Sequence, residues 1–505
     1  MATHATCAPG PGNMSALGWI DWTIFSGYLV VVFLLGLWFM REQETSEDYF
    51  VGGRRMKWWA VGVSLFATAF SSLSFVALPR EGAYADYHLF VTYLFIPLVI
   101  TPVLWWLFVP VYLRLGVTSV YEYLEVRFNR TMRRLGTLLF ALYAIGWMGS
   151  MVYATGLILK AVLNLNESQF TWMVIAVGLF ATLYTTLGGI KAVIWTDVLQ
   201  AVTLGGGMLV VLVLAVQKID GGLATVVELG LEHGKFQMFD FRVDLTERNT
   251  FLSACCLGLF VYLPGYTTSQ VTVQRYVCMS DLREARRALL INALVATLVA
   301  VLFFFVGTTL FAFYHQPGAA GFPELERQDQ LLPHFVLAEL PYAGLTGLLL
   351  AGLFAAVMST IDSGINSLTA VVVYDWLSGR DLPVAWSRFL CGLFGAAVIG
   401  AALVASRMDK HVIDIIIGIA GSFLGLLLGV FLVGMLVRRA NTGGALVGLA
   451  AGAMSLAFVW TQTSIHGWWY GAYTCLPTFG VGVLASYLFR PPRLAQLRGL
   501  ARTKQ

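Results

Sequence analysis

Runs of about 20 apolar residues recur along the whole chain and constrain its fold more than any other feature. Each run is long enough to cross the hydrocarbon core of a bilayer. Because lipid offers no hydrogen-bond partners, a crossing segment must satisfy its own backbone, as a helix does. The sequence therefore predicts an all-α polytopic membrane protein with about 13 transmembrane helices. The predicted spans are 20–40, 57–79, 89–113, 135–161, 171–188, 195–217, 250–274, 288–314, 343–376, 386–406, 412–437, 443–461 and 468–489.

The composition argues against several functional classes. Hydrophobic residues make up 58% of the chain and charged residues 12%, so no separate soluble domain is expected. The net charge of +4 does not indicate nucleic acid as a partner, because the basic residues lie in short loops. Neither the 7 histidines nor the 6 cysteines show the spacing of a catalytic or metal motif. We therefore predict no enzyme, no organic cofactor and no obligate protein partner.

The positions of Lys and Arg predict the orientation. With the N-terminus outside, 23 of the 32 basic residues lie in segments on the cytoplasmic side. Cytoplasmic loops of membrane proteins carry an excess of these residues. The predicted location is the cell membrane, crossed many times, with the N-terminus outside and the C-terminus in the cytoplasm.

Two spans carry signals for an interrupted helix. The middle of span 57–79 is crowded with hydroxyl side chains. Span 250–274 contains Pro264 and Gly265, which predict that the helix opens there because one lacks a backbone donor and the other is a poor helix former. These spans are five apart and run in opposite directions. Paired interrupted helices in two inverted halves are typical of the binding site of a secondary transporter.

A polar face within span 343–376 predicts a cation site. Its members follow helical spacing, i, i+3, i+4 and i+7: Ala356, Ser359, Thr360 and Ser363. Asp362 flanks this face, and a carboxylate within a membrane normally faces a polar interior and has a function. Hydroxyl, carboxylate and carbonyl oxygens suit a small hard cation, and unwinding at 67–70 would free carbonyls facing it. Alternatively, small and hydroxylated residues simply allow close helix packing.

Two further residues have alternative interpretations. Asp197 lies at the cytoplasmic start of its span, where it either interacts with the helix dipole or joins Asp362 in an ion route or second cation site. Trp147 lies mid-span, one turn from Tyr143, and either lines a solute cavity or packs against core or lipid.

These motifs resemble those of the sodium:solute symporter family, in the same order and along nearly the whole chain. The segments that carry the resemblance are 48–54, 59–74, 118–124, 188–200, 274–276 and 355–367. Within the family, the chain is most similar to the bacterial sialic-acid branch, as in 66–72 and 121–124.

The resemblance implies a leucine-transporter type fold with two inverted repeats of five helices. The first repeat would comprise 57–217 and the second 250–437. A leading helix, 20–40, would precede them, and two trailing helices within 443–489 and a cytoplasmic tail, 490–505, would follow.

The resemblance also implies two ion sites. One sodium ion would be held by the carbonyls of Ala67, Phe70 and Ala356 and the hydroxyls of Ser359 and Thr360. A second sodium ion in the sialic-acid branch uses the positions that match Ser359, Asp362, Ser363 and Asp197. Asp362 stands where that branch has a serine, so tighter cation binding or a proton-sensitive site is expected.

The implied solute region involves Ser71, Ser74, Thr92, Trp147 and Phe260. Trp147 stands where the branch has its carboxylate-binding arginine. A sugar, a polyol or another neutral polar solute is therefore as consistent with the sequence as an organic acid.

Together these features predict a sodium-coupled secondary active symporter that imports a small polar organic solute by alternating access. The solute would be a sugar, a sialic-acid-like molecule or another organic acid, and the partners would be this solute, sodium ions and the lipid bilayer. The alternatives are a transporter-like sensor and an uncoupled solute channel. A sensor normally carries a cytoplasmic signalling domain, and a channel would pass solute without sodium coupling.

Overall fold

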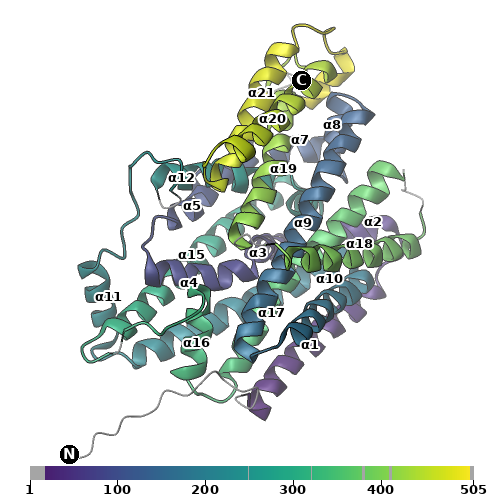
Figure 1. Cartoon of the computed structure of the whole chain (residues 1–505). Helices are drawn as coiled ribbons and strands as arrows, with labels where there is room; N and C mark the ends of the chain where they lie inside the picture. The colour runs from purple at the N-terminus through teal and green to yellow at the C-terminus, as the bar shows by residue number, and fades with distance from the viewer. Residues whose placement is uncertain (1–16, 248–249, 320, 378–381, 409–411, 501–505) are drawn as a thin grey trace, which may run out of the picture.

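The computed structural model describes residues 17–247, 250–319, 321–377, 382–408 and 412–500. Within these ranges the regular structure is helical, apart from one isolated β-bridge between Arg55 and Met279 (Figure 1). This agrees with the predicted all-α class.

Nine helices in the described ranges are long and apolar enough to cross a membrane, and two bent helix pairs raise that number to 11. The nine are α1 (Trp19–Met40), the continuous segment α5 to α7 (Phe90–Leu115), α9 (Arg130–Leu163), α10 (Glu167–Gln217), α15 (Leu282–His315), α17 with η7 (Leu345–Trp376), α18 (Val384–Ala405), α19 (Val412–Leu436) and α20 (Thr442–Gln462).

The predicted number of about 13 differs from this count for two structural reasons. Helix α10 contains both predicted spans 171–188 and 195–217, with a break at Gly189, whose φ of 56° and ψ of −166° are not helical. A side chain is excluded there, because an added Cβ would lie 2.8 Å from the carbonyl oxygen of Tyr49. The last apolar helix, α21 (Tyr470–Ala485), has only 16 residues. The exact number of crossings therefore stays a prediction.

The first interrupted span consists of α3 (Trp58–Ala69) and α4 (Ser72–Tyr84), which are bent by 70°. Between them Phe70 is extended, with φ −95° and ψ 101°. Ser71 caps the second half, since its hydroxyl accepts from the N–H of Ser74. The break therefore lies within the hydroxyl-rich stretch.

The second interrupted span is built from α12 (Phe251–Leu257), the π-helical turn η5 (Gly258–Tyr262), α13 (Leu263–Thr267) and α14 (Gln270–Val277). Its 48° bend falls between Thr267 and Gln270, so the predicted opening at Pro264 and Gly265 is wrong. Pro264 instead lies in the first turn of α13, directly after the wide turn η5. The helix continues through the proline, because the π-helical turn before it changes the backbone hydrogen bonding where the proline lacks an N–H.

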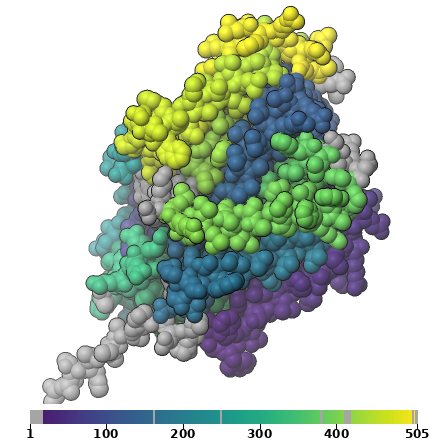
Figure 2. All heavy atoms as spheres, turned by 45° about the vertical axis from the view of Figure 1, so that its right-hand side comes forward, coloured from purple at the N-terminus to yellow at the C-terminus, as the bar shows by residue number. Residues whose placement is uncertain are grey.

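Helix α17 lies at the centre of the bundle, in contact with α1, α3, α4, α9, α10, α14 and α18. Of its most apolar stretch 89% is buried, against 17% for α1. Helices α20 and α21 pack on each other and on α19, and form a lobe at one edge of the molecule, whereas α1 lies at another edge (Figure 2). The leading and last helices thus flank a core built around α17.

Short helices occupy the two ends of the bundle. Helices α11 (Gly222–Glu232) and α16 (Leu331–Ala338) lie at one end, and α2 (Ser46–Val51) and α8 (Glu122–Arg127) lie at the other (Figure 1). The turns η2 (Gly52–Arg54), η6 (Gln328–Gln330), η8 (Gly467–Trp469) and η9 (Leu494–Gly499) complete the connections. The end that carries α11 and α16 is called the outer end below, following the predicted orientation.

Candidate ion and solute sites

The end of half-helix α3 meets the polar face of α17. The hydroxyl of Ser359 donates to the carbonyl oxygen of Ala67 at 3.0 Å and lies 3.1 Å from that of Ala356. The hydroxyl of Thr360 lies 3.3 Å from the Ala356 carbonyl. The last carbonyls of a helix lack helical N–H partners, so the end of α3 offers free oxygens to α17. This junction presents the hard oxygen ligands that a sodium ion uses.

Four of the five residues implied for the first sodium site thus come together: Ala67, Ala356, Ser359 and Thr360. The fifth, Phe70, is the buried residue that ends α3. Its ring packs on Phe66 and Phe303, with centroid distances of 5.4 and 4.9 Å. Its carbonyl follows those of the last turn of α3, at the helix break.

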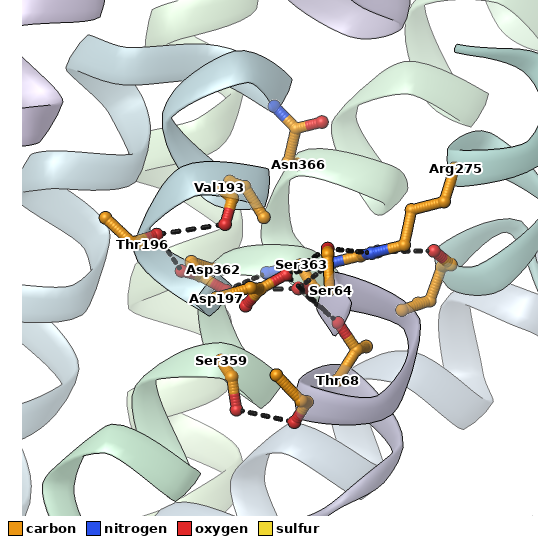
Figure 3. A network of polar contacts seen from close by, with 12 residues as sticks. Ser64, Thr68, Val193, Thr196, Asp197, Arg275, Ser359, Asp362, Ser363 and Asn366 are labelled. Carbon is orange, nitrogen blue, oxygen red and sulfur yellow. Dashed lines mark hydrogen bonds and ion pairs between the residues drawn. The ribbon is translucent and has the colours of Figure 1, made fainter. Parts of the chain in front are cut away.

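A second polar cluster surrounds Arg275 of α14 (Figure 3). Its guanidinium donates to a carboxylate oxygen of Asp197 at 2.7 Å and to the hydroxyls of Ser64 at 2.7 Å and Ser363 at 2.6 Å. The hydroxyl of Thr68 lies 3.4 Å from Asp197 and 3.2 Å from Ser363. Arginine, aspartate and both serines are fully buried. The cluster therefore connects α3, α10, α14 and α17.

Asp362 lies on the far side of this cluster from Arg275. Its carboxylate accepts from the hydroxyl of Tyr184 at 2.8 Å and lies 3.5 Å from that of Thr196. It also accepts from the backbone N–H and the hydroxyl of Ser363. These partners are neutral, and Asp362 is fully buried.

The charges of this cluster favour a bound cation. Of the two buried carboxylates, Asp197 pairs with the guanidinium of Arg275, whereas Asp362 has neutral partners only, and one oxygen of Asp197 has no hydrogen-bond partner. A buried carboxylate without a counter-charge is costly. Groups of three or more His, Cys, Asp or Glu that could hold a metal ion do not occur in the described part of the chain. The mixed hydroxyl and carboxylate donors suit an alkali cation better than a transition metal.

Sequence reasoning assigned no site role to five members of this cluster: Ser64, Thr68, Tyr184, Thr196 and Arg275. The strongest available signal was Arg275, a basic residue next to an interrupted span. The hydroxyls of Ser64 and Thr68 lie one turn apart and so share a face of α3. Tyr184 and Thr196 lie on either side of the Gly189 break, which brings both to Asp362.

A cavity of about 210 Å³ lies beside the first ion junction. Both halves of each interrupted span contribute to its wall, together with α9 and α17. Thr68 and Thr360 line it, so the cavity borders directly on the residues of the ion sites. Aromatic side chains form much of the remaining wall, namely Tyr93, Tyr143, Trp147, Tyr262, Tyr266 and Trp468. Such a wall suits a small organic molecule.

Three of the five residues implied for the solute line this cavity: Ser71, Ser74 and Trp147. The other two lie outside its lining. The hydroxyl of Thr92 points to the carbonyl oxygen of Ala254 at 3.4 Å. Phe260 packs against Gly471, where an added Cβ would lie 2.4 Å from the Phe260 carbonyl oxygen. The cavity also includes Arg80 and Glu81, to which the sequence analysis assigned no role.

Residues 49–452 match the model of the sodium:solute symporter family. The chain belongs to this family. It is therefore a sodium-coupled symporter of an organic solute and a multi-pass membrane protein, as the sequence predicts. Transport rather than enzymatic catalysis is the activity of the family.

Curated relatives cover nearly the whole symporter. It is 32% identical to the sodium/sialic acid symporter NanT of Aliivibrio fischeri, over 94% of either chain. It is 35% identical to the human sodium-coupled monocarboxylate transporter 1, over 86% of this chain and 72% of that protein.

Solved structures confirm the all-helical transporter fold of the symporter. A Na+-coupled sialic acid symporter in a substrate-bound outward-open state superposes with a TM-score of 0.85 at 30% identity, covering 94% of this chain and 98% of that one. Mhp1, a nucleobase-cation-symport-1 family transporter, superposes with a TM-score of 0.57 at 14% identity, covering 89% and 97%. The second likeness concerns the fold alone.

Proposed function

We propose that this symporter imports a small polar organic solute together with sodium across the cell membrane, with its N-terminus outside and its C-terminus in the cytoplasm. The first sodium ion binds where α3 ends against α17, held by the carbonyls of Ala67, Phe70 and Ala356 and the hydroxyls of Ser359 and Thr360. The observation that carries this proposal is the 3.0 Å contact between the Ser359 hydroxyl and the Ala67 carbonyl. It joins the interrupted span of α3 and α4 to the central helix α17.

A second cation binds at Asp197, Asp362 and Ser363. The support is electrostatic, because Arg275 pairs with the buried carboxylate of Asp197 and leaves that of Asp362 without an ion-pair partner. The cation balances Asp362, whose hydrogen-bond partners are neutral.

The solute binds in the 210 Å³ cavity, against Trp147 and the hydroxyls of Ser71 and Ser74. Thr92 and Phe260 support this cavity from behind its wall. The candidate solutes are a sugar, a sialic-acid-like molecule and another organic acid. Relatives named for sialic acid and for monocarboxylates are consistent with such a solute.

Coupling follows from the junction between α3 and α17. A sodium ion that bridges them stabilises the arrangement in which the solute cavity is complete, and a ligand shifts a population only by binding one state better than the other. Each sodium ion entering a negative cell gains about 2.3 kcal/mol per 100 mV. This energy drives solute uptake against its gradient.

The test is sodium-dependent uptake by proteoliposomes that hold the full chain. Ser359→Ala and Thr360→Ala should abolish sodium-dependent uptake while leaving the protein folded. Thr369→Val is the control on the same helix, because the Thr369 hydroxyl donates to the Ile365 carbonyl and contacts the Cys391 thiol rather than the ion junction. If uptake by both alanine variants kept the wild-type sodium dependence, the proposed first sodium site would be wrong.

The alternatives have distinct outcomes in the same assay. An uncoupled channel would pass solute at equal rates with sodium or choline on the outside. A sensor would bind solute without net uptake in either buffer.

A further inference from the structure

Arg80 and Glu81 are the charged residues among the side chains that line the solute cavity in the described part of the chain. Both belong to the second half of the interrupted span, α4, near its outer end. Arg80 is therefore the cation that a solute in this cavity can meet. The exposed fractions of the two residues are 6% and 3%, so neither charge is solvated by bulk water.

Arg80 is held by two carboxylates. It forms an ion pair with its neighbour Glu81 and a second one with Asp329 of η6 at 3.0 Å. Asp329 comes from the segment that joins α15 to α17 at the outer end, 249 positions away in the sequence. The second ion pair thus links this segment to the rim of the cavity.

Asp329 has a second cationic partner, whereas Arg80 lines the cavity and contacts Asp329 and Glu81 through its guanidinium. Arg327 lies 3.3 Å from Asp329 and is partly exposed. If Asp329 separates from Arg80, Arg327 still neutralises it. An acidic solute at Arg80 would then restore the charge balance that Asp329 provided. The exchange of one carboxylate for another leaves no buried charge unpaired, which is the condition for a low electrostatic cost.

The backbone that carries Arg80 is anchored, so the exchange does not require α4 to move. Gly82 packs directly on α15, where an added Cβ would lie 2.2 Å from the carbonyl oxygen of Phe304. Lys235 donates to the carbonyls of Ala83 and Ala85 at 2.8 and 3.0 Å, and so caps the end of α4. Arg80 is thus a preorganised group, and its planar fork suits a carboxylate.

We propose that Arg80 recognises the carboxylate of an acidic organic solute, which takes the place of Asp329 as its partner. This inference rests on the proposed function and narrows its solute to a carboxylate-bearing molecule. Position 147 is a tryptophan here, where the sialic-acid branch has its carboxylate-binding arginine. Arg80, on a different helix, would supply that cation instead. Asp329 acts as an internal competitor and occupies Arg80 in the empty transporter.

The experiment measures binding to the purified full chain in detergent. Tryptophan fluorescence reports binding, since Trp147 and Trp468 line the cavity. The probes are N-acetylneuraminate, lactate and nicotinate as Tris salts, compared with the neutral N-acetylmannosamine, lactamide and nicotinamide. Each is titrated in sodium chloride and in choline chloride. At least one acid should bind in sodium at least about tenfold more tightly than its neutral counterpart, as expected for a charge-assisted pair.

Three variants separate recognition of the solute from a purely structural role of the ion pair. Asp329→Asn keeps the Arg80–Glu81 pair and removes the competitor, so binding of the acid should tighten about fivefold or more. Arg80→Gln should lose the preference for the acid over its neutral counterpart. A structural role predicts the opposite for Asp329→Asn, namely weaker binding of every probe. Arg80→Lys keeps a cation without the fork, and its acid binding should fall between the wild-type and glutamine values.

The outcomes distinguish this inference from the proposed function. Equal binding of acids and neutral analogues, no binding of any acid, or weaker acid binding by Asp329→Asn overturns the role of Arg80. Acid binding that is equal in sodium and choline leaves Arg80 in place and contradicts sodium coupling instead.

Discussion

The ion-binding region comprises the junction between Ala67 and Ser359 and the cluster around Arg275. It shares helices α3 and α17 with the solute cavity but differs from it in how its polar groups are satisfied. In the cluster, Arg275 donates to Asp197 at 2.7 Å and to Ser363 at 2.6 Å, and all three residues are fully buried. The cavity instead has an open volume of about 210 Å³ and a wall of aromatic rings and hydroxyls. A packed, charged cluster tolerates few changes, whereas a cavity wall changes specificity when one side chain is replaced. The difference suggests that ion coupling and solute choice are encoded in separate residues.

The two regions meet at two threonines. Thr68 lies 3.4 Å from Asp197 and also lines the cavity. Thr360 lies 3.3 Å from the carbonyl oxygen of Ala356 and lines the cavity as well. An ion and a solute bound at these places would touch the same side chains. This shared boundary is the shortest route for coupling between them.

The largest effect is expected in the ion cluster, from Arg275→Gln. It leaves the buried carboxylate of Asp197 without its cation, and breaking such a pair costs about 3–5 kcal/mol. The variant should unfold at a much lower temperature in detergent and should not transport. The double variant Arg275→Gln with Asp197→Asn should recover part of this loss. If the single variant unfolds at the wild-type temperature, the cluster around Arg275 does not contribute to stability as expected.

Among the variants of the cavity wall, Trp147→Ala should change solute affinity most. Loss of an aromatic wall should raise the KM for solute about tenfold or more, whereas the sodium concentration for half-maximal uptake should change less than about twofold. Uptake measured over a matrix of sodium and solute concentrations separates the two. Trp147→Phe keeps a ring and serves as the control. If Trp147→Ala lowered sodium affinity as much as solute affinity, ion coupling and solute choice would not depend on separate residues.

Asp362→Asn should give an intermediate effect that is confined to sodium. It removes the carboxylate that has neutral partners, so the second cation should bind about tenfold more weakly. The Hill coefficient for sodium should fall towards 1, and solute KM at saturating sodium should stay within about threefold. Ser367→Ala, whose hydroxyl on the same helix bonds to Gln274, is the control. An unchanged Hill coefficient would remove Asp362 from the ion site.

The smallest effect should come from Thr92→Val. Its hydroxyl lies outside the cavity lining and bonds to a backbone carbonyl, so uptake should change less than about twofold. Ser74→Ala, which lines the cavity, should raise KM about threefold or more. If Thr92→Val proved the more damaging of the two, the cavity would extend further than its observed wall.

The sequence by itself determined the helical class, the family and the polar face of α17. Membrane spans are read from continuous apolar runs, and one helix presents Ala356, Ser359 and Thr360 together through its 3.6-residue period. The hydroxyl-rich break near Phe70 was likewise visible, because it follows from residues that are adjacent in the chain.

Only the tertiary structure decided which distant groups meet. The bend after Thr267, rather than at Pro264, sets which side chains of the second interrupted span face the cavity. The pairing of Arg275 with Asp197 and of Arg80 with Asp329 depends on how segments that are far apart in the sequence pack together. Local periodicity places a residue on a face of its own helix. It carries no information about the partner across the interface, because that partner is set by the packing of the whole bundle.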